Sequence, residues 1–239
     1  MTHDTAAHAL PAAYRAWRAS TLGRITDRIE EDLLRELLGS VEGRQLLDAG
    51  CGDGALAVQL ARAGACVTGL DADALMLAAA RARATRAAVD LRLVRGGVEN
   101  APFAALSFDG VVAVAVLCFI RDADAAIDQL ARLLRPGGRL VIGELGRWNL
   151  WAAGRRIQGW RGSPIWRTAR FRTRGELCAL LRRHGLAVEA VRGAVFYTPL
   201  GMAARALAPL DPWLGRRTTA GAAFIAVQAR RLDLGALGG

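Results

Sequence analysis

The sequence predicts a single α/β domain, in which helices cover both faces of a mostly parallel, doubly wound sheet. Short apolar runs alternate with helical stretches through the first 145 residues. The runs are continuous rather than interrupted by polar residues, which is typical of strands covered on both faces. The chain of 239 residues is long enough for one sizeable core of this kind and short for two.

The expected strands and helices follow one another in the order of βαβ units. Apolar runs predict five strands, at residues 45–49, 66–70, 91–94, 109–116 and 139–143. Helices are expected between them, at residues 55–63, 73–86 and 122–134. An RPGG turn precedes the fifth strand, at residues 135–138. A later helix begins at Thr173, which forms a capping box with Glu176. His184 in its last turn is expected to have a structural role, because a cation there interacts favourably with the helix dipole.

The net charge of +10 is unevenly distributed. Residues 1–145 contain 16 Arg and 18 acidic residues, a net of −2, whereas residues 146–239 contain 16 Arg and 4 acidic residues, a net of +12. All 32 basic residues are Arg. Together with abundant Ala and Gly, this indicates a coding bias more than selection for phosphate recognition. We therefore do not expect nucleic acid as a partner.

The cysteines and the apolar runs predict the compartment. Four cysteines lie far apart without a CxxC pairing, so neither a disulfide framework nor a metal site is expected, and a reducing cytoplasm fits best. The N-terminus lacks the pattern of a signal peptide. The longest apolar stretch, residues 111–120, has ten residues, against roughly 20 for a bilayer span. We expect a soluble cytoplasmic protein, at most peripherally associated with a membrane.

The strongest motif is LLDAGCGDG at residues 46–54, where a buried strand runs into a glycine-rich turn that opens a helix. Gly50, Gly52 and Gly54 let backbone amides approach a ligand closely at the positive end of the helix. The spacing G-x-G-x-G is not the G-x-G-x-x-G of dinucleotide sites. Asp71 ends the second strand, 23 residues after Asp48, where an acid accepts hydrogen bonds from ribose hydroxyls. Together these features predict a site for an adenosine-bearing ligand without a diphosphate. Asp48 has an alternative role in capping local amides.

Five motifs in register carry a resemblance to a known family. They are LLDAGCGDG, VTGLDAD, GGVENAPF, FDGVVAVAVLCFIRD and LLRPGGRLVIGEL. In this order and spacing they resemble the class I S-adenosylmethionine-dependent methyltransferases, in particular the type 11 branch, over about residues 10–190. The resemblance implies an enzyme that uses S-adenosyl-L-methionine. It also implies a seven-stranded sheet whose last strand is antiparallel, with residues 187–191 and 223–228 as strands six and seven.

The resemblance implies cofactor contacts at the carboxyl ends of the first four strands. The glycine-rich turn surrounds the methionine part, Asp71 binds the ribose, and Ala72 lies beside the adenine. Where the family commonly has Asp, this chain has Gly97, which leaves the adenine to Val98 and Glu99. The implied contacts are Asp48, Gly50, Cys51, Gly52, Asp71, Ala72, Val98, Glu99 and Val114.

Two residues are candidates for a catalytic role. Glu144 ends the fifth strand at the edge of the sheet where open α/β proteins bind ligands, so it is a candidate base or substrate contact, against a structural role. Tyr14 belongs to a segment that resembles a lid over the cofactor in this family. There Tyr14 and Trp17 either exclude water from the reaction and contact the substrate, or bury themselves against the sheet.

Residues 147–174 contain eight Arg, no acidic residue and four of the six Trp. One interpretation is a substrate cap, with Trp148 and Trp151 as aromatic walls and Arg for an anionic group. A second is an interfacial helix at an anionic membrane, because Leu150, Ala153, Ile157 and Trp160 share one helix face, which Trp151 does not join. A third is RNA contact by stacking. The fourth is a surface excursion that packs its Trp under its own Arg.

We therefore expect one domain over residues 1–239. Its parts are an N-terminal helical lid (1–44), a cofactor-binding core (45–145), a basic Trp-rich cap (146–175), and a C-terminal helix with the last strands (176–239). The expected reaction is direct, metal-free methyl transfer to a small-molecule or lipid-like acceptor, such as an aromatic or quinone-type hydroxyl or carbon. A peripheral membrane contact through residues 147–174 stays open.

Two alternatives to this function also stay open. A nucleic-acid methyltransferase is disfavoured because VLCF, rather than an NPPY-like tetrapeptide, follows the fourth strand. The other alternative is a catalytically silent cofactor-binding module that regulates a partner. An intact glycine-rich turn with Asp71 disfavours loss of cofactor binding, but is compatible with loss of the chemistry.

Overall fold

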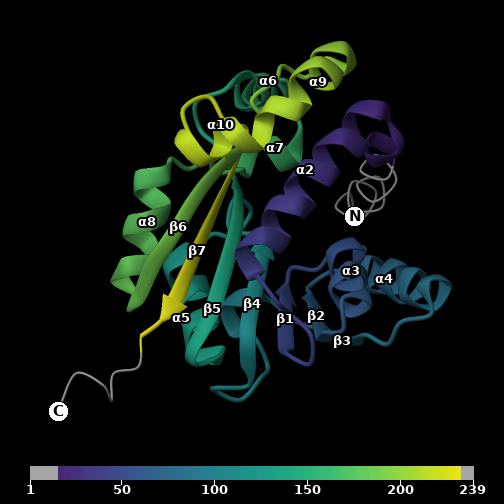
Figure 1. Ribbon diagram of the computed structural model, residues 1–239, viewed down its shortest axis with the longest axis vertical. Helices are drawn as coiled ribbons and strands as arrows, with labels where there is room; N and C mark the ends of the chain where they lie inside the picture. Colours follow the sequence, from purple (N-terminus) through teal and green to yellow (C-terminus); the bar gives the residue numbers. More distant parts are fainter. Residues whose placement is uncertain (1–15, 233–239) are drawn as a thin grey trace.

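The computed structural model describes residues 16–232. The seven strands in this range form one sheet, with helices packed around it (Figure 1). The strand order is β3-β2-β1-β4-β5-β7-β6. The first five strands are parallel, and β7 is antiparallel to both of its neighbours. The strands are β1 (Gln45–Ala49), β2 (Cys66–Asp71), β3 (Arg92–Arg95), β4 (Phe108–Val114), β5 (Leu134–Leu145), β6 (Leu186–Ala194) and β7 (Phe224–Arg231). The predicted fold class and the antiparallel last strand are confirmed.

Several helices begin at a residue whose side chain accepts from free N–H groups. Asp73 caps α4, Asp122 caps α5, and Thr173 forms the predicted capping box with Glu176 at α8. The helices are α2 (Thr21–Leu38), α3 (Ala55–Arg62), α4 (Ala74–Ala87), α5 (Ala123–Leu133), α6 (Leu150–Trp160), α7 (Pro164–Thr168), α8 (Arg174–Arg183), α9 (Gly201–Leu207) and α10 (Asp211–Arg217), with 3-10 turns η1 (Val98–Asn100) and η2 (Ala208–Leu210).

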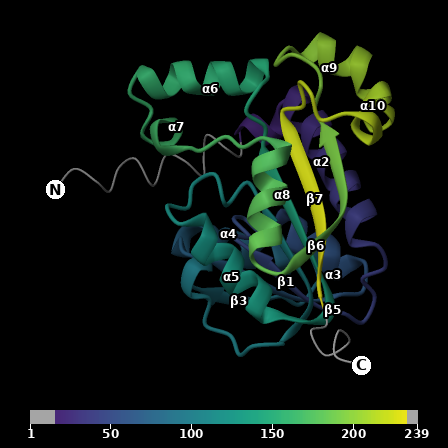
Figure 2. The same ribbon diagram turned by 90° about the vertical axis from the view of Figure 1, so that its left-hand side faces the viewer.

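The sheet has a core on each face. Helices α2 and α3 cover one face, where Leu34, Leu60 and Val141 pack together. Helices α5 and α8 cover the other, around Leu130, Leu140 and Leu181 (Figures 1 and 2). Continuous apolar strands are explained by this double cover. Within the residues described, no helix combines the length and apolar character needed to span a membrane.

One expected boundary is wrong at the fifth strand. The RPGG turn was expected to precede this strand, but it lies inside β5, which begins at Leu134. Leu134 pairs with Phe108 and Arg139 pairs with Gly110, so the ladder shifts register between these pairs and residues 135–138 are an irregular insertion. Turn residues can be accommodated here because a bulge takes up extra residues on one strand.

The carboxyl ends of the parallel strands meet at one edge of the sheet. Strand β6 ends at the same edge, because Leu145 of β5 and Ala194 of β6 both pair with Phe224. Helix α6 follows β5 after four residues, and α9 and α10 follow β6. The glycine-rich turn after β1, Asp71 at the end of β2, and these helices therefore all follow strand ends at the same edge of the sheet. Ligands of open α/β sheets bind at this edge.

Candidate active site

The glycine-rich turn joins β1 to α3 and is attached to β2. The N–H groups of Gly50 and Cys51 both donate to the carbonyl oxygen of Leu70, at 2.7 and 2.9 Å. Gly50, Gly52 and Gly54 have φ values of +77°, +52° and +72°. In this left-handed region a Cβ is costly and glycine is favoured. The turn thus requires glycine for its own backbone.

Gly50 and Gly52 differ in the space around them. A Cβ on Gly50 would lie 2.3 Å from Cγ2 of Val116, whereas a Cβ on Gly52 would meet no atom of residues 16–232 within 4 Å. The protein itself fills the space beside Gly50, while the space beside Gly52 is open. An open cradle at the start of a helix lets a ligand approach backbone N–H groups.

Asp71 ends β2, and its carboxylate lies against the glycine-rich turn. Its Oδ2 accepts from the N–H of Gly52 at 2.8 Å, and its Oδ1 accepts from the N–H of Asp73 at 2.9 Å. The residue is only half-buried, and each carboxylate oxygen can accept a further hydrogen bond. Asp71 can therefore accept from two ligand hydroxyls while the backbone holds it in place.

Asp48 is buried in β1 and has an oxygen without a partner. The residue is 3% exposed, and within the described chain its Oδ2 accepts no hydrogen bond. Burial, with a smaller contribution from the negative charge of Asp71, raises the pKa of Asp48 to about 7. An unpartnered buried oxygen is uncommon and costly. A cationic ligand that donates a hydrogen bond would satisfy it and would be favoured by the two neighbouring acids.

Asp53, inside the turn, is held by arginines from two distant parts of the chain. Arg18, which precedes α2, donates to Oδ1 of Asp53 at 3.2 Å and also pairs with Asp27 and Glu31 of α2. Arg83 of α4 pairs with Oδ2 of Asp53 and donates to its carbonyl oxygen. These contacts join the N-terminal segment to the turn. Sequence reasoning missed them, because no motif or spacing links residues 18, 53 and 83.

The predicted adenine contacts lie after β2 and in η1. The carbonyl oxygen of Ala72 accepts from Nε of Arg95 at 3.3 Å. Val98 is buried in the core, and Oε1 of the half-buried Glu99 accepts from the N–H of Asp122 at 3.4 Å. A Cβ at Gly97 would meet no atom within 4 Å. These positions are compatible with the adenine contacts, which stay predictions.

The segment after β4 lies against the glycine-rich turn. Val114 ends β4, and Ala115 has a φ of +50°, while its N–H donates to the carbonyl oxygen of Gly143 at 2.7 Å. Val116 then fills the space beside Gly50. Cys51 is buried, and burial raises the pKa of its thiol. Contacts of Cys51 and Val114 with the cofactor stay predictions.

Glu144 is fully buried near the end of β5. Its Oε1 accepts from the N–H groups of Val116 at 3.2 Å and Leu117 at 2.8 Å, while its Oε2 has no hydrogen-bond partner among the described residues. Burial raises the pKa of Glu144 to about 7, although the Arg172 charge and the two N–H groups act in the opposite direction. These contacts favour positioning of the segment after β4. A catalytic role stays a prediction, and Tyr14 lies outside the described residues.

The cap begins and ends beside β5. The N–H of Arg147 donates to the carbonyl oxygen of Arg172 at 3.1 Å, and the N–H of Arg172 donates to that of Leu145 at 3.2 Å. Between these contacts the chain forms α6 and α7. The four residues predicted to share one face of α6 point to solvent: Leu150, Ala153, Ile157 and Trp160.

The three tryptophans predicted to contact substrate have different surroundings. Trp151 is buried, its Nε1–H donates to the carbonyl oxygen of Tyr197 at 2.9 Å, and its ring packs edge-on against Tyr197. Trp17 is half-buried and packs against the core cluster that α2 helps to form. Trp148 is 71% exposed, with the Arg156 guanidinium 5.7 Å from its ring centre. The contacts of Trp151 favour a packing role, whereas Trp148 is the most exposed of these three.

Known proteins match the part of the chain that contains the glycine-rich turn and Asp71. Residues 47–142 match a family described as a methyltransferase domain. An uncharacterised protein of Mycobacterium tuberculosis is 35% identical over 231 residues, which cover 96% of this chain and 75% of that one. A ubiquinone biosynthesis O-methyltransferase of Alkalilimnicola ehrlichii is 38% identical over 117 residues, 48% of this chain and 47% of that one. A Thermotoga maritima structure, described as a possible histamine N-methyltransferase, superposes with a TM-score of 0.70 at 21% identity, covering 92% of this chain and 95% of that one.

The strand order, the glycine-rich turn and these matches define a class of enzyme. The chain belongs to the class I S-adenosylmethionine-dependent methyltransferases. Its methyl donor is accordingly S-adenosyl-L-methionine. The open space beside Gly52 and the unpartnered oxygen of Asp48 fit this cationic ligand.

Proposed function

We propose that this methyltransferase acts on a small or lipid-like acceptor, such as an aromatic or quinone-type hydroxyl or carbon. The observation that best supports this proposal is the position of the cap. Because α6 follows β5 after four residues, Trp148 and the apolar face of α6 lie at the same sheet edge as the glycine-rich turn (Figure 2). The quinone-pathway relative supports this class of acceptor over about half of its length.

The residues of the site have an orienting role in this reaction. When bound, S-adenosylmethionine supplies an electrophilic methyl group on a positively charged sulfur. Asp71 would accept from the ribose hydroxyls, and Asp48 would accept from the methionine ammonium. Alignment of this kind can lower the barrier by roughly 7–11 kcal/mol, so a direct transfer needs little further catalysis. A hydroxyl acceptor also needs a base, for which Glu144 and Tyr14 are the candidates.

A labelling experiment tests the acceptor class. The full chain is incubated with methyl-labelled S-adenosylmethionine and, separately, a catechol, a demethylated quinone and total RNA. We expect label in the aromatic or quinone acceptor. Label in RNA alone, with binding that weakens as salt increases, would instead identify a nucleic-acid methyltransferase. Cofactor binding without turnover on any acceptor would favour the silent regulatory module.

We also propose that the cap contacts membranes peripherally through residues 147–174, and that α9 and α10 extend this contact. Both groups of helices lie at one end of the molecule (Figures 1 and 2). They carry a set of exposed apolar side chains, here called the apolar end: Trp148, Leu150, Ile157, Trp160, Leu200, Met202, Leu207, Leu210 and Trp213. Exposed apolar patches of this kind mark interaction surfaces.

The charge around the apolar end fits an anionic bilayer. Arg156 stacks over Trp148 and Arg217 stacks over Trp213, with the guanidinium 4.0 Å from the latter ring centre. Asp211, the acid in this part of the chain, is 2% exposed and accepts from two backbone N–H groups. Tryptophan and arginine at one surface are typical of interfacial helices at anionic lipids.

Vesicle flotation tests this contact. Wild-type protein is expected to float with phosphatidylglycerol vesicles and much less with phosphatidylcholine. The double variant W148A/W160A should lose flotation, whereas L106A, which truncates an exposed leucine away from the apolar end, should retain it. Wild-type protein that stays unbound with both lipids contradicts the proposal. Lost flotation with unchanged activity on a soluble acceptor would make the cap a membrane anchor rather than a substrate cap.

A further inference from the structure

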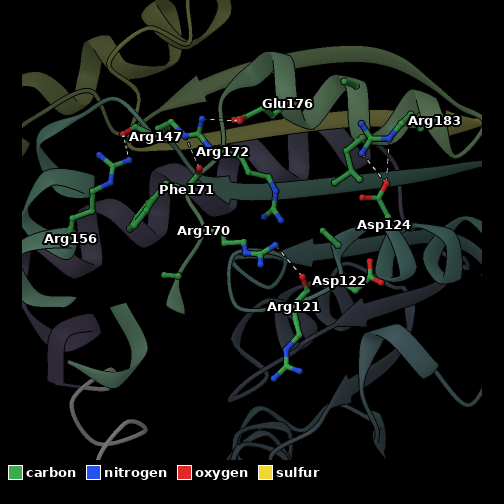
Figure 3. Close-up of a pocket in the computed structure, with 14 residues that line it drawn as sticks. Arg121, Asp122, Asp124, Arg147, Arg156, Arg170, Phe171, Arg172, Glu176 and Arg183 are labelled. Carbon is green, nitrogen blue, oxygen red and sulfur yellow. Dashed lines mark hydrogen bonds and ion pairs between the residues drawn. The ribbon is translucent and has the colours of Figure 1, made fainter. Parts of the chain in front are cut away.

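An arginine-lined groove lies between the start of α5, residues 169–172 at the end of the cap, and α8 (Figure 3). Its volume is about 840 Å³, within the range of about 300–1,000 Å³ that is typical of small-molecule sites. Phe171 and Leu180, both buried, contribute apolar lining. Six arginines from four segments of the chain line it: Arg121, Arg147, Arg156, Arg170, Arg172 and Arg183.

The acids that line the groove already have partners. Glu176 pairs with Arg147 at 2.8 Å, and its other oxygen accepts from Thr173 in the capping box. Asp124 accepts from Arg183 at 2.8 Å and contacts His184. Asp122 caps α5 by accepting from the N–H of Ala125. The groove therefore holds more positive charge than its own acids neutralise.

Among the described residues, no acidic side chain lies within hydrogen-bond distance of four arginines of the groove. Three of them each donate to a backbone carbonyl oxygen: Arg156 to Arg147 at 3.0 Å, Arg170 to Arg121 at 3.2 Å, and Arg172 to Leu117 at 2.9 Å. One such bond orients a guanidinium and leaves most of its five N–H donors available. The guanidinium of Arg121 makes neither a hydrogen bond nor an ion pair with the described residues, although its backbone carbonyl oxygen accepts from Arg170.

Arg156 is oriented in a second way. Its guanidinium lies over the ring of Phe171, 5.1 Å from the ring centre, and also over Trp148. Stacking between two aromatic rings restricts the planar group. The close-up shows side chains from the cap, from the segment after β4 and from α8 gathered around the same space (Figure 3). Arginines from several segments that line one groove suit an anion with several oxygens, because each guanidinium can donate two parallel hydrogen bonds.

From these observations we infer that the groove is a binding site for a phosphate or diphosphate group. The ligand is distinct from the methyl donor, whose cationic sulfur and ammonium would be repelled here. The inference does not depend on the identity of the methyl acceptor. Through its bond to the Leu117 carbonyl oxygen, Arg172 connects the groove to the segment that Glu144 holds beside the glycine-rich turn.

Titration calorimetry with inorganic pyrophosphate tests the site on the full chain. Wild-type protein is expected to bind pyrophosphate, and R121A/R170A should weaken this binding at least ten-fold while leaving S-adenosylmethionine affinity unchanged. The matched control is R86A, which removes an exposed arginine from α4 and should bind pyrophosphate as wild type does. Should the double variant fail to fold, R121A is used alone, because it removes no side-chain hydrogen bond or ion pair of the described chain and keeps the carbonyl oxygen that accepts from Arg170.

Three results would overturn the site: no binding by wild type, an equal loss in R86A, or unchanged binding in the folded groove variants. A competition arm then separates the two sources of a phosphate group. Pyrophosphate that displaces the protein from phosphatidylglycerol vesicles indicates a lipid headgroup in the groove. Pyrophosphate that binds without displacing it indicates a free phosphorylated molecule. Either result of the competition supports the site itself.

Discussion

Asp48 in β1 and Glu144 in β5 are two buried carboxyl groups for which we expect different roles. Burial raises the pKa of both to about 7. Each keeps one oxygen without a partner within the described chain, while the other oxygen of Glu144 accepts from the N–H groups of Val116 and Leu117. These two hydrogen bonds favour a positioning role for Glu144, and the place of Asp48 in β1, just before the glycine-rich turn, favours a ligand-binding role.

The variant E144Q separates positioning from base catalysis. Its carbonyl oxygen can still accept from Val116 and Leu117, but an amide cannot accept the acceptor's proton. If Glu144 positions this segment, kcat should stay within a few-fold of wild type. Loss of a general base would instead lower the rate by about 10²–10⁴-fold. Steady-state rates of wild type and E144Q, with E144A as the variant that removes the hydrogen bonds, distinguish the two.

The same variant should flatten the dependence of stability on pH. The pKa of Glu144 is about 7 in the folded chain, against an ordinary value of 4.5. Between these values the folded chain keeps a proton that the unfolded chain has lost, so stability falls as pH rises through this window. At one pKa unit per 1.36 kcal/mol, up to about 3 kcal/mol is lost. Denaturant unfolding at pH 5 and pH 8 should show a smaller difference for E144Q, and an identical difference in both proteins contradicts the assignment.

At the scale of the element, we expect two glycines of the glycine-rich turn to have different roles. Gly50 leaves room for a neighbouring side chain, and Gly52 leaves room for the ligand. Gly50 faces Val116, and Gly52 faces open space. We expect G50A to lower the free energy of unfolding by about 2–4 kcal/mol, through a strained φ and overpacking. G52A should cost only about 1–2 kcal/mol, from the φ alone.

Among folded variants, we expect G52A to weaken cofactor binding more than G50A does, the reverse of their order in stability. A methyl group at Gly52 occupies the cradle, so G52A should weaken S-adenosylmethionine binding at least ten-fold while the protein stays folded. Thermal unfolding and calorimetry on both variants check this pair. Unchanged affinity in folded G52A would show that the ligand does not approach the turn at this point.

Most elements could be predicted from the sequence, because their signals are local. Asp73, Asp122 and Thr173 mark helix starts through side-chain caps, and continuous apolar runs mark buried strands. The turn inside β5 was misplaced, because proline and glycine normally end a strand, whereas pairing with β4 continues on both sides of residues 135–138. A register shift is a property of two strands and leaves no pattern in one.

At the scale of the whole molecule, the cap tryptophans divide into a structural one and exposed ones. W151A should destabilise the chain by about 3–5 kcal/mol, because it removes a buried ring together with its hydrogen bond to Tyr197. W160A, at an 83% exposed position, should change stability by less than about 0.5 kcal/mol. Denaturant titrations measure both. Equal losses in the two variants would mean that Trp160 is also packed in solution.

Contacts between distant segments could not be predicted from the sequence. The glycine-rich turn and Asp71 could be found, because both follow strands in a familiar order. The ion pairs of Asp53 and the arginine-lined groove join residues up to about 60 positions apart, so they become visible only once the fold is assembled. The exposure of α6 is a similar case, since a helical wheel shows that a face is apolar but not whether a partner covers it.

The central claim about this enzyme is that the glycine-rich turn and Asp71 bind S-adenosylmethionine. Calorimetry of wild type and D71A with this ligand and with a nicotinamide dinucleotide tests it in one experiment. We expect wild type to bind S-adenosylmethionine and to prefer it over the dinucleotide. D71A should lose about 1.5–3 kcal/mol of binding free energy, because two hydroxyls lose a charged acceptor. Equal affinities in the two proteins, or tighter binding of the dinucleotide by wild type, would contradict the account.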